Sequence, residues 1–301
     1  MKISPILSPY DSILMDVLGV VHDGEKLIPG LLDLLHQLRL GQKEVIFLTN
    51  SHLTEQDISS LFCSLGLDNS LYKSIITAGD YFHHLMSNEF SENIFFFLNG
   101  EGDGFGNKES PPLSLCDYMV LHKFPKDHEI EPMEHTLLQA LNMNIPLICV
   151  NSDALAHTYR GVEPRPALIS EWYRRMGGVC HTIGKPNPLI FQYAIKHFRF
   201  GNASKVIMIG DSFDTDVEGA CDAGIDCVWV HKNRVCEKKE GHMGCDGQLV
   251  PLLFYVNSRL AAASQPAVPE LLQDKSQGTY PYDSLKNNVF LVDFMHSLLS
   301  C

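Results

Sequence analysis

Four polar segments of this sequence carry residue types suited to phosphate chemistry. They are Asp16, Thr49–Asn50, Gly210–Asp211 and Lys185, the last of which lies in a turn over residues 182–186. Two acids could hold a hard divalent cation such as Mg²⁺, which prefers oxygen ligands. Hydroxyl, backbone amide and ammonium groups could bind phosphate oxygens. One carboxylate could attack phosphorus and form an aspartyl phosphate.

Three of these segments follow short apolar runs that we interpret as buried strands. The first run begins at residue 12 and its strand ends near Asp16, the second covers residues 44–50, and the third covers residues 205–211. A further strand is expected over 226–230. Helical patterns separate them, over residues 31–40, 54–65, 188–198 and 214–223. This alternation predicts an α/β fold with a parallel sheet and helices on both faces. Because the carboxyl ends of parallel strands meet in one crevice, we expect the polar segments to converge there.

Residues 79–176 have a different pattern, which predicts an inserted α/β domain. Apolar runs occur at 94–98, 118–121 and 146–150, with glycine-, proline- and charge-rich connectors between them. A stretch of this length is too long for a loop. We therefore assign residues 1–78 and 177–301 to one discontinuous domain. Residues 246–301 could complete its sheet or form an extension.

Composition narrows the function classes. The chain has 301 residues, 45% of them hydrophobic and 20% charged, as in an ordinary folded protein. A net charge of −13 opposes broad binding to nucleic acid or to anionic membranes. The sequence has no apolar stretch long enough to cross a membrane and no convincing signal peptide. The nine cysteines include no C-x-x-C pair, which favours a reducing, cytoplasmic setting.

The order and spacing of the four segments resemble the motifs of the haloacid dehalogenase superfamily. The resemblance is closest to subclass IIA, the NagD-like group of 4-nitrophenylphosphatase- and phosphoglycolate phosphatase-like proteins. The matching segments are Asp16–Gly24 with Ile28–Gly30, Phe47–Ser51, Gly184–Pro186, Gly210–Gly224 and, where the family usually has Asn-Pro-Asp, Asn151–Asp153. The match covers most of residues 10–232. It implies a Rossmann-like core with a C2-type α/β cap inserted between the second and third motifs.

The resemblance also implies roles for the acidic residues. Asp16 would be the nucleophile. Asp211 would bind Mg²⁺ together with Asp16 and the backbone carbonyl of Leu18. Asp216 would support this metal site from behind.

The other matching residues would bind the substrate. Thr49, Asn50 and Ser51 would contact the phosphate, and Lys185 would neutralise its charge. Arg160 and Arg165 lie in a neighbourhood that faces the substrate in the family, so either could contact an anionic tail of the substrate. A surface salt bridge is the alternative for these arginines.

One position departs from the family pattern. The usual first motif is Asp-x-Asp, whose second aspartate transfers protons, but the corresponding residue here is Leu18. Loss of general acid–base help lowers rates about 10²–10⁴-fold. His22 or Asp23 could supply the proton, or His22 could simply face solvent. Alternatively, the substrate could have a good leaving group, as in an acyl or aryl phosphate, or the protein could bind a phosphorylated ligand without turnover.

We therefore expect a Mg²⁺-dependent phosphohydrolase that acts on a small phosphorylated metabolite through an aspartyl phosphate. A catalytically impaired protein that binds a phosphorylated ligand or partner is the alternative. The sequence leaves the substrate and the oligomeric state open, a homo-oligomer included. A second cluster, His231, Cys236, His242 and Cys245, matches no common zinc spacing, and we interpret it as a solvated loop.

Overall fold

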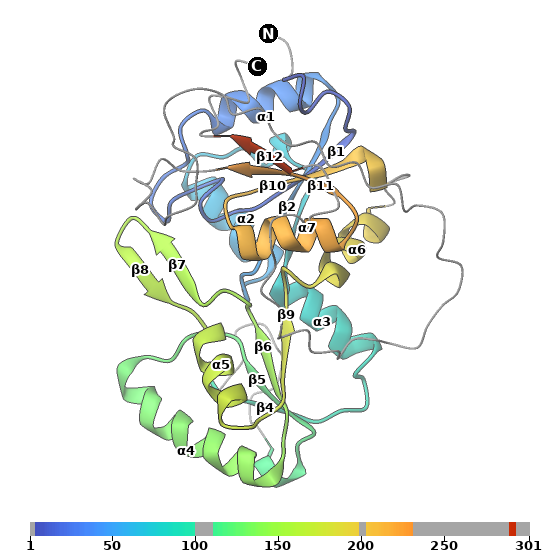
Figure 1. Cartoon of the computed structure of the whole chain (residues 1–301). Coiled ribbons are helices and arrows are strands. Elements are labelled where there is room, and N and C mark those ends of the chain that lie inside the picture. Colours follow the sequence, from blue (N-terminus) through green and yellow to red (C-terminus); the bar gives the residue numbers. More distant parts are fainter. Residues whose placement is uncertain (1–3, 100–110, 199–202, 231–288, 293–301) are drawn as a thin grey trace, which may run out of the picture.

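The computed structural model describes residues 4–99, 111–198, 203–230 and 289–292. Its larger sheet has six strands, and every neighbouring pair is parallel (Figure 1). In spatial order they are β12 (Val289–Val292), β11 (Asp226–Val230), β10 (Val206–Gly210), β1 (Ser12–Met15), β2 (Glu44–Thr49) and β3 (Ser74–Thr77). The α/β fold with a Rossmann-like parallel sheet is therefore confirmed. Because β12 pairs with β11, residues 289–292 complete this sheet.

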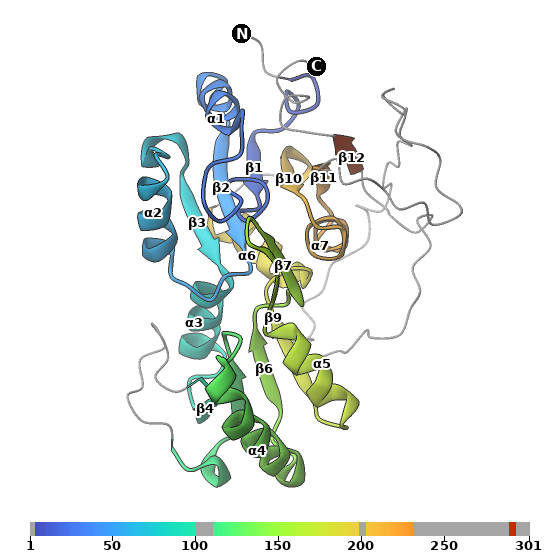
Figure 2. The ribbon, with the colours of Figure 1, turned by 90° about the vertical axis from the view of Figure 1, so that its left-hand side faces the viewer.

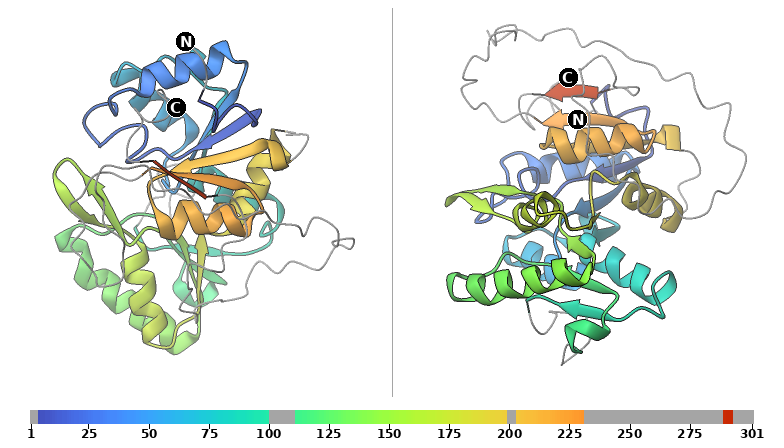
Figure 3. Two further views of the ribbon diagram at one scale, coloured as in Figure 1. Left: turned by 45° about the horizontal axis from the view of Figure 1, so that its top comes forward. Right: turned by 60° about the horizontal axis from the view of Figure 1, so that its bottom comes forward.

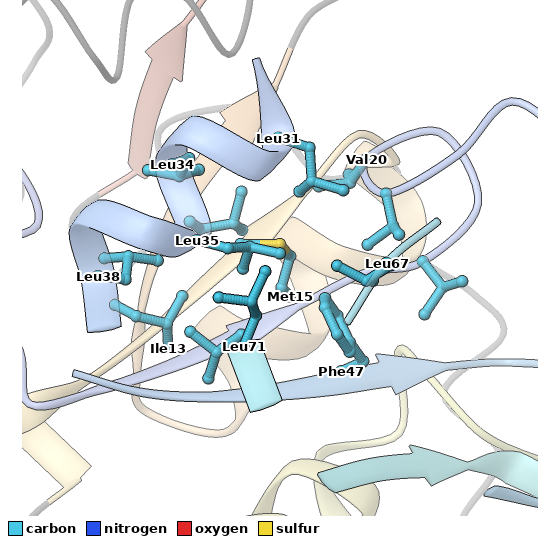
Figure 4. Close-up of a cluster of buried hydrophobic side chains, with 14 of the residues drawn as sticks. Ile13, Met15, Val20, Leu31, Leu34, Leu35, Leu38, Phe47, Leu67 and Leu71 are labelled. Carbon is cyan, nitrogen blue, oxygen red and sulfur yellow. The ribbon is translucent and has the colours of Figure 1, made fainter. Parts of the chain in front are cut away.

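Side chains of the central strands alternate between two apolar clusters, one on each face of the larger sheet. Ile13 and Met15 of β1 lie in the first cluster, and Leu14 lies in the second. The first cluster is covered by α1 (Leu31–Leu40) and α2 (Glu55–Ser64), and Figure 4 shows how the α1 leucines reach it. The second is covered by α6 (Pro188–His197) and α7 (Glu218–Asp222). Burial on both faces explains why these strands are apolar throughout.

A second, smaller parallel sheet is built from the middle of the chain. Its order is β4 (Phe95–Phe97), β5 (Tyr118–Leu121), β6 (Leu147–Val150) and β9 (Cys180–Ile183). Helices α4 (Asp127–Met143) and α5 (Ala167–Arg175) pack on one face. Helix α3 (Ala78–Asn88) contacts the other face and also the larger sheet, so it lies between the two sheets (Figure 2). An antiparallel hairpin, β7 (Leu155–Thr158) and β8 (Gly161–Pro164), leaves this part towards the larger sheet (Figure 3).

The position of β9 bears on where the second part of the chain ends. We expected the return to the first domain at residue 177, yet β9 pairs with β6 in the smaller sheet. We therefore propose that the boundary lies at residues 183–184, directly before Lys185. This placement makes β9 the strand that delivers Lys185.

Local signals in the sequence identify several elements. The capping box before α2 is present, since Thr54 and Asp57 bond to each other's backbone amides. The helix expected over 214–223 is different: residues 213–217 form one π-helical turn, and α7 begins only at Glu218. Short 3₁₀ helices occur at Asn69–Leu71, Leu113–Leu115 and Ala203–Lys205.

Within the described residues, no helix is both long and apolar enough to pass through a membrane. The six cysteines in this part of the chain are not joined in disulfide bonds. The expected loop with His231, Cys236, His242 and Cys245 lies outside the described residues.

Candidate active site

Three carboxylates meet at the carboxyl end of the larger sheet. Asp16 follows β1, Asp211 follows β10, and Asp216 lies in the π-helical turn; each offers an oxygen within 4.8 Å of the others. The adjacent strands set this geometry, because the Asp16 amide donates to the carbonyl of Ile209, 2.8 Å away. The π-helical turn is held by Asp216, whose carboxylate accepts from the Ser212 amide at 3.1 Å.

Lys185 is buried between two of these carboxylates. Its Nζ lies 2.5 Å from Oδ1 of Asp16 and 2.6 Å from Oδ1 of Asp216, and its side chain is only 2% exposed. Burial alone would lower the pKa of Lys185, but Asp16 and Asp216 together outweigh that effect and raise it. Burial raises the pKa of Asp216, and the Asp16 charge adds to the rise, while Lys185 opposes it. The lysine therefore stays charged beside the expected nucleophile.

Two glycines make room for the acids. Gly19 has φ +103°, and a Cβ there would overlap the Asp211 carboxylate. A Cβ on Gly210 would overlap the carboxylate of Asp216. The clustered carboxylates are the hard oxygen donors that Mg²⁺ prefers, so these residues fit such an ion.

Asn50 joins the end of β2 to the other polar segments. Its Oδ1 accepts from the Lys185 amide at 2.7 Å, and its Nδ2 lies 2.8 Å from Ser152 Oγ and 2.9 Å from Asp153 Oδ1. Ser152 Oγ also donates to the Lys185 carbonyl. Asn50 thus fixes the backbone position from which the lysine reaches Asp16.

A cavity of about 520 Å³ opens over these groups. The segments at the carboxyl end of the larger sheet contribute Asp16, Leu18, Thr49, Asn50, Asp211, Ser212, Asp214, Thr215, Trp229 and Val230. Lys185 follows β9 of the smaller sheet, and the segment entering the hairpin contributes residues 152–156. At the hairpin tip the Tyr159 amide donates to the Asp23 carbonyl at 3.0 Å. The hairpin therefore spans from one side of the cavity to the loop after β1.

The cavity gathers most of the residues singled out in the sequence. Asp16, Leu18, Thr49, Asn50, Lys185 and Asp211 line it, and Asp216 lies directly behind Lys185. Ser51 does not line it; its Oγ accepts from the Leu53 amide at 3.2 Å.

His22 and Arg160 lie elsewhere. The buried His22 ring packs edge-on against Phe62, with 6.3 Å between the ring centroids, and its Nδ1 accepts a hydrogen bond from the Gly24 amide. The expectation that His22 supplies a proton in the cavity therefore does not fit its position, and neither does a solvent-facing histidine. Arg160 is exposed at the hairpin tip and donates to the Tyr159 hydroxyl at 2.7 Å, so in this structure it is not directed at a substrate in the cavity.

Asp153 and Trp229 are cavity residues that sequence reasoning missed. Trp229, which belongs to β11, lines the cavity, and its Nε1 donates to the Asp211 carbonyl at 3.2 Å. Asp153 belongs to the segment Asn151–Asp153, which we had interpreted only as the return from the cap. It comes three residues after the apolar run over 146–150, so the sequence gives it only a weak form of the signal that identified Asp16.

The cavity carries more negative than positive groups. Among the described residues that line it, Lys185 is the single cation, against Asp16, Asp153, Asp211 and Asp214. Arg165, the nearest alternative in the sequence, pairs with Glu163 at 3.0 Å. The described part of the cavity therefore has one place for an anionic group, at Lys185.

Comparison with known families supports the sequence resemblance. Residues 13–103 match the family profile of haloacid dehalogenase-like hydrolases, and residues 182–250 match a second, HAD-hydrolase-like profile. The chain is 25% identical over 228 residues to a dihydroxyacetone phosphatase of Corynebacterium glutamicum, which covers 73% of this chain and 80% of that protein.

Solved structures share the fold. A haloacid dehalogenase-like hydrolase from Brucella suis superposes with a TM-score of 0.67 at 24% identity, covering 75% of this chain and 86% of that one. A 4-nitrophenylphosphatase from Thermotoga maritima superposes with a TM-score of 0.63 at 23% identity, and the match covers 75% of this chain and 87% of that one.

Proposed function

Because this chain belongs to the haloacid dehalogenase-like hydrolases, we propose that it is a Mg²⁺-dependent phosphatase that acts on a small phosphorylated metabolite. The observation that carries the proposal is the contact between Lys185 and Asp16 at the floor of the cavity. A carboxylate held beside a buried ammonium is positioned to attack a phosphorus atom whose oxygens the same ammonium attracts.

Each residue at the floor then has a part. Asp16 attacks phosphorus and becomes the aspartyl phosphate, which water hydrolyses. Lys185 holds the phosphate oxygens, and Thr49, which lines the cavity beside it, donates its hydroxyl to them. Asn50 keeps the lysine in place.

The metal would be held by the carboxylates of Asp16 and Asp211, with the Leu18 carbonyl as a further ligand. Asp216 would hold Lys185 and close the site from behind. When bound, Mg²⁺ supplies positive charge that polarises the phosphoryl group and offsets the charge of the surrounding acids.

The cavity favours a phosphate ester whose remaining part is uncharged. Lys185 is the one cation among the described lining residues, and the phosphate occupies it. A second anionic group on the substrate would face Asp153 and Asp214 without a partner. Dihydroxyacetone phosphate, the substrate named for the Corynebacterium relative, has such an uncharged remainder.

A phosphate-release assay with Mg²⁺ tests the proposal. The panel contains 4-nitrophenyl phosphate, dihydroxyacetone phosphate and the carboxylate-bearing phosphoglycolate. Wild-type protein should hydrolyse the first two faster than the third, and Asp16→Asn should abolish release. Asp33→Asn, an exposed aspartate on α1, is the control for the substitution itself.

A ligand-binding protein without turnover is the second candidate, and Leu18 at the cavity wall is the observation that favours it. It predicts that phosphorylated compounds raise the melting temperature while no phosphate is released. Release by wild type that is lost in Asp16→Asn would exclude this candidate. Silence of the wild type on the whole panel would exclude the phosphatase.

A further inference from the structure

The cavity lacks the proton donor that its family resemblance leads one to expect. Leu18 lines the wall at that position and carries no transferable proton. Asp211 belongs to the acidic cluster that fits a metal, and Asp214 is exposed. His22 lies outside the cavity, so among the carboxylates and imidazoles of the described residues the remaining one at the cavity is Asp153.

Asp153 is held rigidly at the cavity wall. It follows β6, and its amide donates to Oδ1 of Asn151 at 2.8 Å, while its carbonyl accepts from the Ala167 amide at the start of α5. One carboxyl oxygen, Oδ1, accepts from Nδ2 of Asn50 at 2.9 Å. The side chain thus has a fixed direction and is only partly covered, since it lines the cavity.

A chain of hydrogen bonds ties this carboxyl to the nucleophile. Asn50 bonds Asp153 through Nδ2 and the Lys185 amide through Oδ1, and Lys185 Nζ bonds Asp16. Asp153 and Asp16 are therefore held in fixed positions relative to each other, although they follow strands of different sheets. Proton transfer needs such fixed placement of the donor relative to the reacting group.

The surroundings of Asp153 favour its protonated form. Burial raises its pKa most strongly, and the charge of Asp16 adds to the rise. The Asn50 hydrogen bond and the charges of Lys185 and Arg165 act in the opposite direction, and the pKa remains raised overall. An acid with a raised pKa is better matched to proton transfer near neutrality.

We propose that Asp153 is the catalytic acid and base of this phosphatase and replaces the aspartate that Leu18 displaces; the proposal rests on the function proposed above. In the first step Asp16 forms a bond to phosphorus, the bond to the leaving oxygen breaks, and the Asp153 proton moves to that oxygen. In the second step water attacks phosphorus, its proton moves to the Asp153 carboxylate, and the bond to Asp16 breaks. An alcohol and inorganic phosphate are the products.

Leaving-group dependence tests the first step. Phenyl phosphate has a poor leaving group that needs a proton, whereas 4-nitrophenyl phosphate has a good one that needs little help. With Mg²⁺ present, Asp153→Asn should lower kcat/KM on phenyl phosphate about 100-fold or more. The loss on 4-nitrophenyl phosphate should be at most about a tenth of that, because kcat/KM reports the steps up to leaving-group departure.

Two further variants separate proton transfer from a structural role. Leu18→Asp added to Asp153→Asn should restore kcat/KM on phenyl phosphate, because it returns an acid to the cavity lining at another position. Asp153→Glu keeps the proton, so the ratio of the two substrates should stay near the wild-type ratio even if both rates fall.

Equal losses on both substrates in Asp153→Asn, or no loss on phenyl phosphate, would overturn the proposal. If Asp153→Asn does not fold, the wild-type protein decides: turnover of phenyl phosphate should fall as pH rises through the pKa of Asp153, and that of 4-nitrophenyl phosphate should not. The same pH profile for both substrates would refute the role. Loss of all activity in Asp16→Asn together with an unselective Asp153→Asn would refute this proposal alone, whereas an inactive wild type would refute both.

Discussion

The buried position of Lys185 predicts a large and specific loss of stability when its charge is removed. In Lys185→Met an uncharged side chain of similar length replaces the lysine, whose Nζ lies 2.5 Å from Oδ1 of Asp16 and 2.6 Å from Oδ1 of Asp216. At an effective dielectric constant of 20, each pair at such a separation attracts by about 6 kcal/mol, most of which offsets the cost of burying the charges. Removing the lysine leaves two buried carboxylates without a cationic partner, and losses of this kind are about 3–5 kcal/mol.

Chemical unfolding in EDTA at neutral pH measures this loss. EDTA removes cations that could replace the ammonium. For a protein near this size the loss corresponds to a fall in melting temperature of roughly 6–20 °C. Lys73→Met is the matched control, because Lys73 Nζ lies 2.7 Å from Glu44 but both side chains are more than one-third exposed. Exposed pairs contribute about 0–1 kcal/mol, so burial is the variable that differs.

A double variant sharpens the test. Asp216→Asn removes one of the two stranded carboxylates, so Lys185→Met with Asp216→Asn should recover at least about 1 kcal/mol relative to Lys185→Met alone. If Lys185→Met costs no more than Lys73→Met, or if the second substitution adds a further loss, the assignment of a buried charge cluster is wrong.

Three other outcomes are expected. Gly19→Ala and Gly66→Ala both place a side chain at a positive φ, which costs about 1–2 kcal/mol of stability. Only Gly19 lies against the Asp211 carboxylate. Only Gly19→Ala should therefore also weaken Mg²⁺ binding, measured by calorimetric titration. Mg²⁺ at 100 times its dissociation constant should stabilise the wild type by about 2.7 kcal/mol in urea unfolding, and an unchanged response in Asp211→Asn would contradict the proposed metal ligands. Because the pKa of Asp153 is raised in the folded protein, its contribution to stability is greatest below the unfolded pKa and is lost as pH rises through the folded pKa. Asp153→Asn should therefore gain stability relative to wild type as pH rises from about 4, the usual pKa of an aspartate, and a difference that stays constant with pH would count against this account.

Sequence patterns located the strands that are followed by proposed site residues. The apolar run before Asp16 and the one before Asp211 are buried on both faces, so their composition alone identifies them. The strand β9 has no such signal, because Cys180–Ile183 carries polar side chains and is only partly buried. Its pairing with β6 is a long-range contact, and this pairing sets the place of Lys185.

The direction of side chains was the other feature that the sequence could not predict. The sequence placed His22 correctly after the first strand, but its ring packs against Phe62 of α2. The sequence pattern does not predict this long-range contact. Asp216 lies with Asp16 and Asp211 as expected, but its ion pair with Lys185 depends on the π-helical turn, which the sequence did not predict. Asp153 needed the structure, because its importance comes from Asn50 and from the cavity above it.

The central position of β1 in the larger sheet has a consequence for synthesis of the chain. Its partner on one side is β2, but its partner on the other side is β10, and the adjoining contact between Pro9 and Lys205 spans 196 residues. At about 5–20 residues per second, ribosomes need roughly 10–40 s between the two strands. During that interval β1, which carries the apolar side chains of Ile13, Leu14 and Met15, lacks its partner strand on one edge. Nascent chains that stop before residue 206 should therefore be prone to aggregate and to recruit chaperones, whatever the stability of the finished protein.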